Sequence, residues 1–145
     1  MIRLAISEDA ISCFNLAKEM YSEFLNRHGI EVNDDDLMQT VENFIVQDQV
    51  LVIDRDGVVG MCAWIVTGHP ANQSMRIFQE VLWCSNSEHK TDAFALLRVM
   101  QDKAREVKAD IVVLANLSLE NEPKLRRIYG RMGFQYLETH YARAN

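Results

Sequence analysis

The spacing of apolar residues changes several times along this chain, and the order of these changes limits the folds it can form. After a short extended run at the N-terminus, two stretches have helical spacing, over residues 8–27 and from Asn33–Asp36 onward. Three extended, β-branched runs follow, at Val50–Ile53, Val58–Thr67 and Arg76–Cys84. The first half of the chain therefore predicts two helices followed by three consecutive strands.

The connections between these three runs differ in kind. Asp56 and Gly57 separate the first two runs and are typical of a tight hairpin turn, because both residue types tolerate a positive φ. A longer polar stretch, Gly68–Ser74, separates the second run from the third and predicts a loop.

Strand and helix patterns alternate elsewhere. Ile2–Ile6 predicts a short first strand, and Ser7 is placed to act as the N-cap of the helix that follows it in the chain. Thr91 or Asp92 can cap a third helix. Ile111–Ala115 has the apolar, β-branched composition of a central strand.

The C-terminal part predicts one more helix and one more strand. Asn121 is placed to cap the helix, Pro123 suits its first turn, and Gly133 suits its end. Phe134–Tyr141 has the pattern of a last strand. The complete order is β-αα-βββ-α-β-α-β, which predicts an α/β fold with a mixed sheet and helices on its faces.

Length and composition favour one soluble domain that spans residues 1–145. The chain of 145 residues is long enough for one core and short for two. No apolar run is long enough to cross a bilayer, and no signal peptide is recognisable. The three cysteines are widely spaced and favour neither a disulfide framework nor a zinc site. We therefore expect a cytoplasmic protein with no metal and no membrane partner.

Charge is distributed unevenly. Residues 1–66 contain 12 acidic and 4 basic side chains, whereas residues 67–145 contain 9 acidic and 11 basic ones. The net charge of −6 argues against general nucleic-acid binding, which depends on neutralising phosphates. The asymmetry indicates either one cationic and one anionic partner or two ordinary solvated surfaces.

The order of elements resembles that of the GNAT acetyltransferases over nearly the whole chain. Ile128–Phe134, which contains Tyr129, resembles the family segment in which a helix ends at glycine before a final hairpin. Glu80 on a strand, a polar loop and a helix that begins Ala93–Leu97 resemble the unit that binds the CoA pyrophosphate. The resemblance implies an N-acyltransferase that uses acetyl-CoA as co-substrate and acetylates a primary amine of a small molecule or peptide.

The loop of this unit departs from the family pattern of Q/R-x-x-G-x-G/A. Glu88 occupies the first position and Thr91 the first glycine position, so Ala93 alone matches. Backbone N–H groups at a helix N-terminus can still hold an anion, whatever the side chains. The resemblance implies the following cofactor-binding candidates: Leu82, Trp83, Cys84, His89, Lys90, Thr91, Asp92, Ala93, Asn121 and Arg126.

Glu80 is the candidate general base. On a regular strand it would share a face with Phe78 and Leu82, and burial there would raise the pKa of its carboxyl group toward neutrality. In the alternative interpretation, Glu80 is a surface carboxylate that pairs with Arg76.

Tyr129 is the candidate acid, because the resemblance implies a tyrosine that protonates the departing thiolate. A phenol with an ordinary pKa near 10 can donate a proton at neutral pH. The alternative is a core aromatic residue of the last helix. A backbone N–H near Trp83 or Cys84 would stabilise the oxyanion.

Acidic residues of the first two helices predict a cationic acceptor, or else they serve only to stabilise helix N-termini. They are Glu19, Glu23, Glu31, Asp34, Asp35, Asp36 and Glu42. His69 is placed in a loop that could border the acceptor. A second hypothesis for the whole chain is a GNAT-fold binding, regulatory or structural module without catalysis, and a homodimer is compatible with either.

Overall fold

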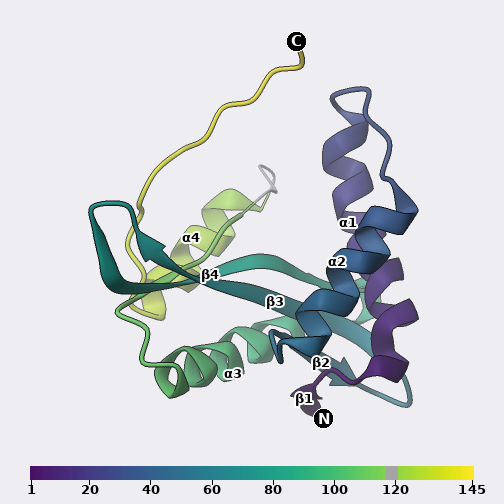
Figure 1. Ribbon diagram of the computed structural model, residues 1–145, viewed down its shortest axis with the longest axis horizontal. Coiled ribbons are helices and arrows are strands. Elements are labelled where there is room, and N and C mark those ends of the chain that lie inside the picture. Colours follow the sequence, from purple (N-terminus) through teal and green to yellow (C-terminus); the bar gives the residue numbers. More distant parts are fainter. Residues whose placement is uncertain (117–120) are drawn as a thin grey trace.

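A five-stranded mixed sheet forms the centre of the computed structural model, which describes residues 1–116 and 121–145 (Figure 1). The strands follow one another across the sheet in chain order: β1 (Ile2–Leu4), β2 (Val50–Asp54), β3 (Val58–His69), β4 (Asn72–Ser85) and β5 (Ile111–Val113). The first four strands are antiparallel neighbours, and β5 runs parallel to β4. The expected mixed sheet is confirmed.

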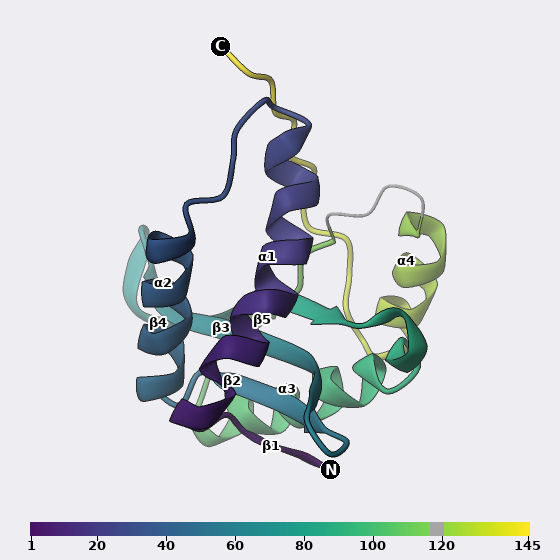
Figure 2. The same cartoon turned by 90° about the vertical axis from the view of Figure 1, so that its right-hand side faces the viewer.

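Helices cover both faces of the sheet (Figures 1 and 2). The helices are α1 (Ala10–Asn26), α2 (Asp34–Val46), α3 (Ala93–Glu106) and α4 (Glu122–Arg131), with short 3₁₀ turns η1 (Ser7–Asp9) and η2 (Ser87–His89). Helices α1 and α2 pack on one face, and α3 packs on the other. Within the described ranges, no helix has both the length and the apolar character that crossing a bilayer requires.

The alternation of side chains along β3 produces two separate hydrophobic cores. Met61 and Ala63 belong to the core beneath α1 and α2, whereas Cys62 and Trp64 belong to the core above α3. Both faces of the central strands are therefore buried. This explains why β3 reads as a nearly continuous apolar run rather than an alternating one.

Strand β4 contains a bulge at Val81. Ala63 of β3 pairs with Leu82, but the next residue, Trp64, pairs with Glu80, so Val81 is the extra residue. Phe78 consequently lies in the α3 core, whereas Leu82 lies in the core beneath α1 and α2. The expectation that both share a face with Glu80 is wrong, because the bulge reverses the alternation between them.

The connection between β3 and β4 is a tight turn rather than the expected loop at Gly68–Ser74. The two strands pair as far as His69 and Asn72. The His69 Nδ1 atom accepts a hydrogen bond from the Ala71 N–H at 3.0 Å within this turn. Long strands therefore replace the loop, and His69 has a local role in the turn.

The C-terminal end of the sheet also differs from expectation. Residues 134–141 form no strand, and the last described strand, β5, lies at the edge of the sheet rather than at its centre. A strand pattern becomes a strand only where a partner backbone supplies the ladder. Because β5 has only three residues and pairs with β4, it provides little backbone for a sixth strand.

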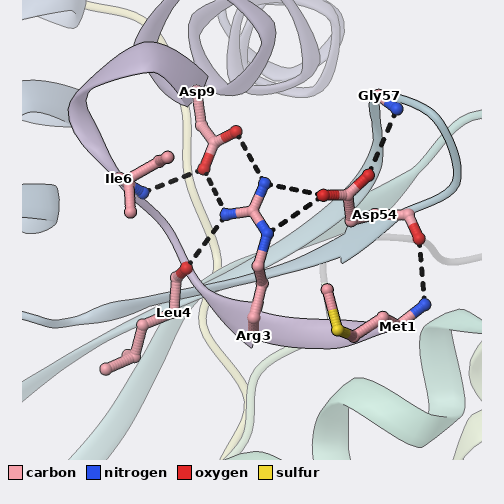
Figure 3. A network of polar contacts seen from close by, with 7 residues as sticks. All are labelled: Met1, Arg3, Leu4, Ile6, Asp9, Asp54 and Gly57. Carbon is pink, nitrogen blue, oxygen red and sulfur yellow. Dashed lines mark hydrogen bonds and ion pairs between the residues drawn. The ribbon is translucent and has the colours of Figure 1, made fainter.

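An ion-pair network ties the first strand to the hairpin (Figure 3). Arg3 donates to both carboxylate oxygens of Asp9, at 2.6 and 3.0 Å, and to Asp54 at 2.8 and 3.0 Å. Asp9 also accepts a hydrogen bond from the Ile6 N–H at 2.9 Å, so the Asp9 side chain bonds to the backbone at the start of this helical segment. The prediction that Ser7 is the N-cap is therefore wrong. The hydrogen bonds from Arg3 hold the pKa of Asp9 and of Asp54 below its ordinary value.

We expect Arg3→Leu to lower the free energy of unfolding at pH 7 by about 2–3 kcal/mol, between the limits for surface and buried pairs. The substitution leaves Asp9, which is 8% exposed, without its cation. Carboxylates with a lowered pKa stabilise the fold above their ordinary pKa near 3.8 and lose that contribution as the pH falls. The difference between variant and wild type should therefore shrink below about pH 4. Urea unfolding at several pH values measures it.

Arg105→Leu is the matched control, because Arg105 pairs with Asp102 on the exposed surface of α3. Such pairs contribute at most about 1 kcal/mol. Equal destabilisation by the two substitutions would contradict a specific role for the network.

Candidate active site

A pocket of about 420 Å³ lies between α1, β4 and the chain around α4. Its lining comprises Met20, Glu23, Phe24 and Arg27 of α1, Gln79, Glu80, Val81 and Trp83 of β4, Ala115 and Asn116 after β5, and Leu125 of α4. The volume falls in the range of small-molecule sites. Of the catalytic and cofactor-binding residues predicted from the sequence, Glu80 and Trp83 line it directly.

Glu80 is the buried acid of this pocket. Its side chain belongs to a residue only 4% exposed, and its Oε2 atom accepts a hydrogen bond from the Ala115 N–H at 3.1 Å. Burial raises the pKa of the Glu80 carboxyl group to about 7, although the hydrogen bond acts in the opposite direction. The alternative pairing with Arg76 is wrong, because the Arg76 guanidinium donates to the Val107 carbonyl at 2.7 Å.

The side chains of Tyr129 and Glu80 are both hydrogen-bonded to the main chain of Ala115. The Tyr129 hydroxyl donates to the Ala115 carbonyl at 3.4 Å, and the Tyr129 ring lies 6.4 Å from that of Trp83. Burial, and then the proximity of Glu80, raise the pKa of the Tyr129 hydroxyl above its ordinary value. Tyr129 therefore remains protonated at neutral pH and has a proton to donate, although the raised pKa makes it a weaker acid than an ordinary phenol.

The two neighbouring strands separate beside Glu80. The ladder between β4 and β5 covers only Ile77–Gln79, whereas β4 remains paired with β3 as far as Ser85. From Glu80 onward, β4 has no partner strand on the β5 side in the described chain. An opening of this kind leaves main-chain groups of β4 available to a ligand.

The three β4 residues expected to bind cofactor have different environments. Leu82 is buried beneath α1 and α2. The Trp83 indole N–H donates to the Ala93 carbonyl at 2.8 Å, which fastens β4 to the start of α3. Burial raises the pKa of the Cys84 thiol to about 12, so this cysteine is unsuited to nucleophilic chemistry.

The degenerate loop is compatible with an anion at the start of α3. Asp92 lies at the N-cap position, and its carboxylate is paired with Arg55 at 3.2 Å and with His89 at 3.4 Å. The Arg55 guanidinium offsets the negative charge that a diphosphate would meet at Asp92. Thr91 is not among the described non-glycine residues with positive φ, so this backbone needs no glycine there. At the start of this 14-residue helix the Ala95 N–H donates to the Asp92 carbonyl at 3.0 Å, whereas the N–H groups of Ala93 and Phe94 come too early in the helix to have an acceptor within it.

The other cofactor candidates do not all converge on this point. Lys90 is exposed beside the helix start, and Asn121 occupies the N-cap position of α4. Arg126 donates to Glu122 at 2.7 Å and lies 5.2 Å from the centroid of the Tyr136 ring. Arg126 is therefore engaged within the C-terminal part of the chain rather than at the start of α3.

Sequence reasoning missed several contributors to the site, and three of them show why. Ala115 joins Glu80 to Tyr129 through its two main-chain groups, and no residue type signals such a role. Arg55 comes from the β2–β3 turn, 37 positions before the Asp92 that it neutralises. Arg27 lines the pocket one helical turn after Glu23 and pairs with it at 2.9 Å.

Comparisons with known proteins agree with this architecture. No protein-family model and no curated protein matches the sequence. A predicted acetyltransferase from Clostridium acetobutylicum, solved with acetyl-CoA, is similar over 97% of this chain and 95% of its own, with 19% identity and a TM-score of 0.66. A GNAT family acetyltransferase from Staphylococcus aureus is similar over 100% and 98%, with 13% identity and a TM-score of 0.63.

A transcriptional regulator from Bacillus halodurans is similar to an equal degree. It matches over 97% of this chain and 99% of its own, with 16% identity and a TM-score of 0.70. Likenesses at this level of identity concern the arrangement of the backbone, and fold alone does not determine function. The element order, the separation of β4 from β5 and these matches together establish that the chain has the GNAT acetyltransferase fold.

Proposed function

We propose that this protein is an N-acetyltransferase that moves the acetyl group of acetyl-CoA to a primary amine. The observation that carries the proposal is the buried Glu80 carboxylate, which lines a pocket of small-molecule size and has a pKa of about 7. A base with this pKa can accept a proton near neutral pH, where most free amines are protonated and unreactive.

Each side chain has one role in the proposed reaction. Acetyl-CoA supplies the activated acetyl group, with its pyrophosphate at the N-terminus of α3 and beside Lys90. Glu80 takes the proton that the amine must lose, and the Tyr129 hydroxyl protonates the departing thiolate. Main-chain N–H groups of β4 near Trp83 or Cys84 stabilise charge on the thioester oxygen.

A binding or regulatory module is the second candidate function. It is favoured by the carboxylates of Glu88 and Asp92 near the start of α3, where the co-substrate needs positive charge. The similar regulator from Bacillus halodurans adds to this case. Failure to bind acetyl-CoA would select this alternative.

We expect acetyl-CoA to raise the melting temperature of the protein. At a concentration of 100 times Kd, stabilisation of about 2.7 kcal/mol corresponds to roughly 5–10 °C for a chain of this size. Differential scanning calorimetry with acetyl-CoA, CoA and desulfo-CoA measures the shift. No shift at millimolar acetyl-CoA would contradict the proposal.

Lys90→Glu should weaken acetyl-CoA binding several-fold, because it adds negative charge beside the helix N-terminus. Arg98→Glu is the matched control, since Arg98 is an exposed cation farther along the same helix. Equal effects of both reversals would indicate a general charge effect rather than a pyrophosphate site.

A further inference from the structure

The walls of the pocket are mainly apolar. Met20 and Phe24 of α1, Val81 and Trp83 of β4 and Leu125 of α4 all contribute to the lining. The indole N–H of Trp83 is already bonded to the Ala93 carbonyl, so the Trp83 ring offers the pocket chiefly apolar surface. Such walls stabilise a ligand by removing its apolar surface from water.

The negative charge expected around the acceptor is largely absent from the pocket. Of the seven acidic residues proposed from the sequence, only Glu23 lines it. Glu23 is paired with Arg27, another lining residue, at 2.9 Å. Asp34, from the same acidic group, pairs with Lys18 at 2.8 Å. The side chains of Glu23 and Arg27 are 74% and 54% exposed, so the solvent-facing end of the pocket, which we call its mouth, carries a balanced ion pair rather than an anionic rim.

Among the lining residues that the structure describes, Glu80 is the other carboxylate. One buried carboxylate can receive one amino group, and burying a second cation without a partner would be costly. A polyamine would have to place its further charges against apolar walls, beside Arg27, or beside the neutral amides of Gln79 and Asn116, and none of these supplies a negative charge. An amine with an apolar body avoids both costs.

We propose that this pocket takes a small primary amine whose body beyond the amino group is apolar or aromatic, and that polycations are poor ligands. The claim that such an amine is the acetyl acceptor rests on the N-acetyltransferase function proposed above. As a statement about which ligand the pocket takes, the inference can be tested without turnover.

The test is a titration of the full-length protein at pH 8 with β-phenylethylamine and, separately, with spermidine. The indole N–H resonance of Trp83 reports on the pocket, and that of Trp64, which is buried against Phe78, reports on the core. We expect β-phenylethylamine to shift the Trp83 signal and to bind at least about tenfold more tightly than spermidine. Stronger binding of spermidine, or binding of neither amine at Trp83, would overturn the inference.

Two matched pairs of variants sharpen the result. Phe24→Leu should weaken β-phenylethylamine binding by about tenfold, whereas Phe14→Leu, on the same helix but outside the lining, should not. Arg27→Gln should improve spermidine binding, because it leaves Glu23 unpaired at the mouth. Equal effects of Phe24→Leu and Phe14→Leu would contradict the assignment.

Turnover separates this inference from the proposed function. Preferential acetylation of β-phenylethylamine would support both. Acetylation of spermidine in preference would overturn the inference and leave the acetyltransferase proposal standing. Binding of β-phenylethylamine at Trp83 without any effect of acetyl-CoA would refute the acetyltransferase proposal and support the assigned ligand class.

Discussion

Glu80→Gln is expected to lower kcat/KM for amine acetylation by about 10²–10⁴-fold, the usual contribution of a positioned general base. Glutamine cannot take up the proton, but its side-chain oxygen can still accept the hydrogen bond from the Ala115 N–H. The wild-type rate should rise with pH through the Glu80 pKa of about 7 and then level off, and the variant should lack this transition. Steady-state kinetics from roughly pH 5.5 to pH 9, a range that extends to both sides of the expected transition, provide the measurement.

The same substitution has a predicted effect on stability with the opposite sign. Between the ordinary pKa of 4.5 and the folded value of about 7, folded Glu80 keeps a proton that the unfolded chain has released. Wild-type stability therefore falls as the pH rises through this window, by about 3 kcal/mol in total. Glu80→Gln carries no such penalty, so at pH 8 the variant should be the more stable protein while being the less active one.

Glu42→Gln is the control for both measurements, because Glu42 is exposed on α2 and lies outside the pocket lining. It should change neither the pH–rate profile nor the pH dependence of unfolding. If Glu80→Gln retained wild-type activity and the same pH profile, Glu80 would not be the base.

Tyr129→Phe is expected to lower kcat by about 10²-fold, which is the second large effect. Phenylalanine keeps the ring that packs beside Trp83 but removes the proton for the departing thiolate. The lost bond to the Ala115 carbonyl is long, at 3.4 Å, so the cost in stability should stay below about 1 kcal/mol. The KM for acetyl-CoA should change little, because the proposed role concerns the transition state.

Tyr21→Phe is a closely matched control. The Tyr21 hydroxyl also donates to a main-chain carbonyl, that of Val81 at 3.2 Å, but Tyr21 is not part of the pocket lining. It should lower stability by a similar amount and reduce kcat far less than Tyr129→Phe, although the Tyr21 hydroxyl holds the pocket-lining Val81 next to Glu80. Full kcat in Tyr129→Phe would identify Tyr129 as a core aromatic residue of α4 and would remove it from the chemistry.

The local patterns of the sequence were sufficient to predict most of the secondary structure. The Asp56–Gly57 turn forms with both residues at positive φ, and Asn33 caps α2 by accepting from the Asp36 N–H at 3.0 Å. These features depend on neighbours within a few positions, which is why the sequence reveals them. The last strand, Phe134–Tyr141, was predicted on the same basis and is absent, because a strand also needs a distant partner.

The candidate site was predictable only in its residue types. The sequence supplied a carboxylate on an apolar strand and a tyrosine near the end of a helix, and the burial of Glu80 is confirmed. The bulge at Val81, which decides the faces on which Phe78 and Leu82 lie, was not predictable. A bulge is set by how two strands fit against the layers on both sides, and strand residues alone do not specify it.

The sequence by itself determined the order of helices and strands, the turn chemistry and the chemical groups available for proton transfer. Only the tertiary structure decided which groups meet: it joined Glu80 to Tyr129 through Ala115 and placed Arg55 beside Asp92. It also paired Arg27 with Glu23 at the pocket mouth and so removed the expected anionic rim. The physical reason is that propensity and capping act over a few residues, whereas burial, pKa and charge balance depend on side chains brought together from distant parts of the chain.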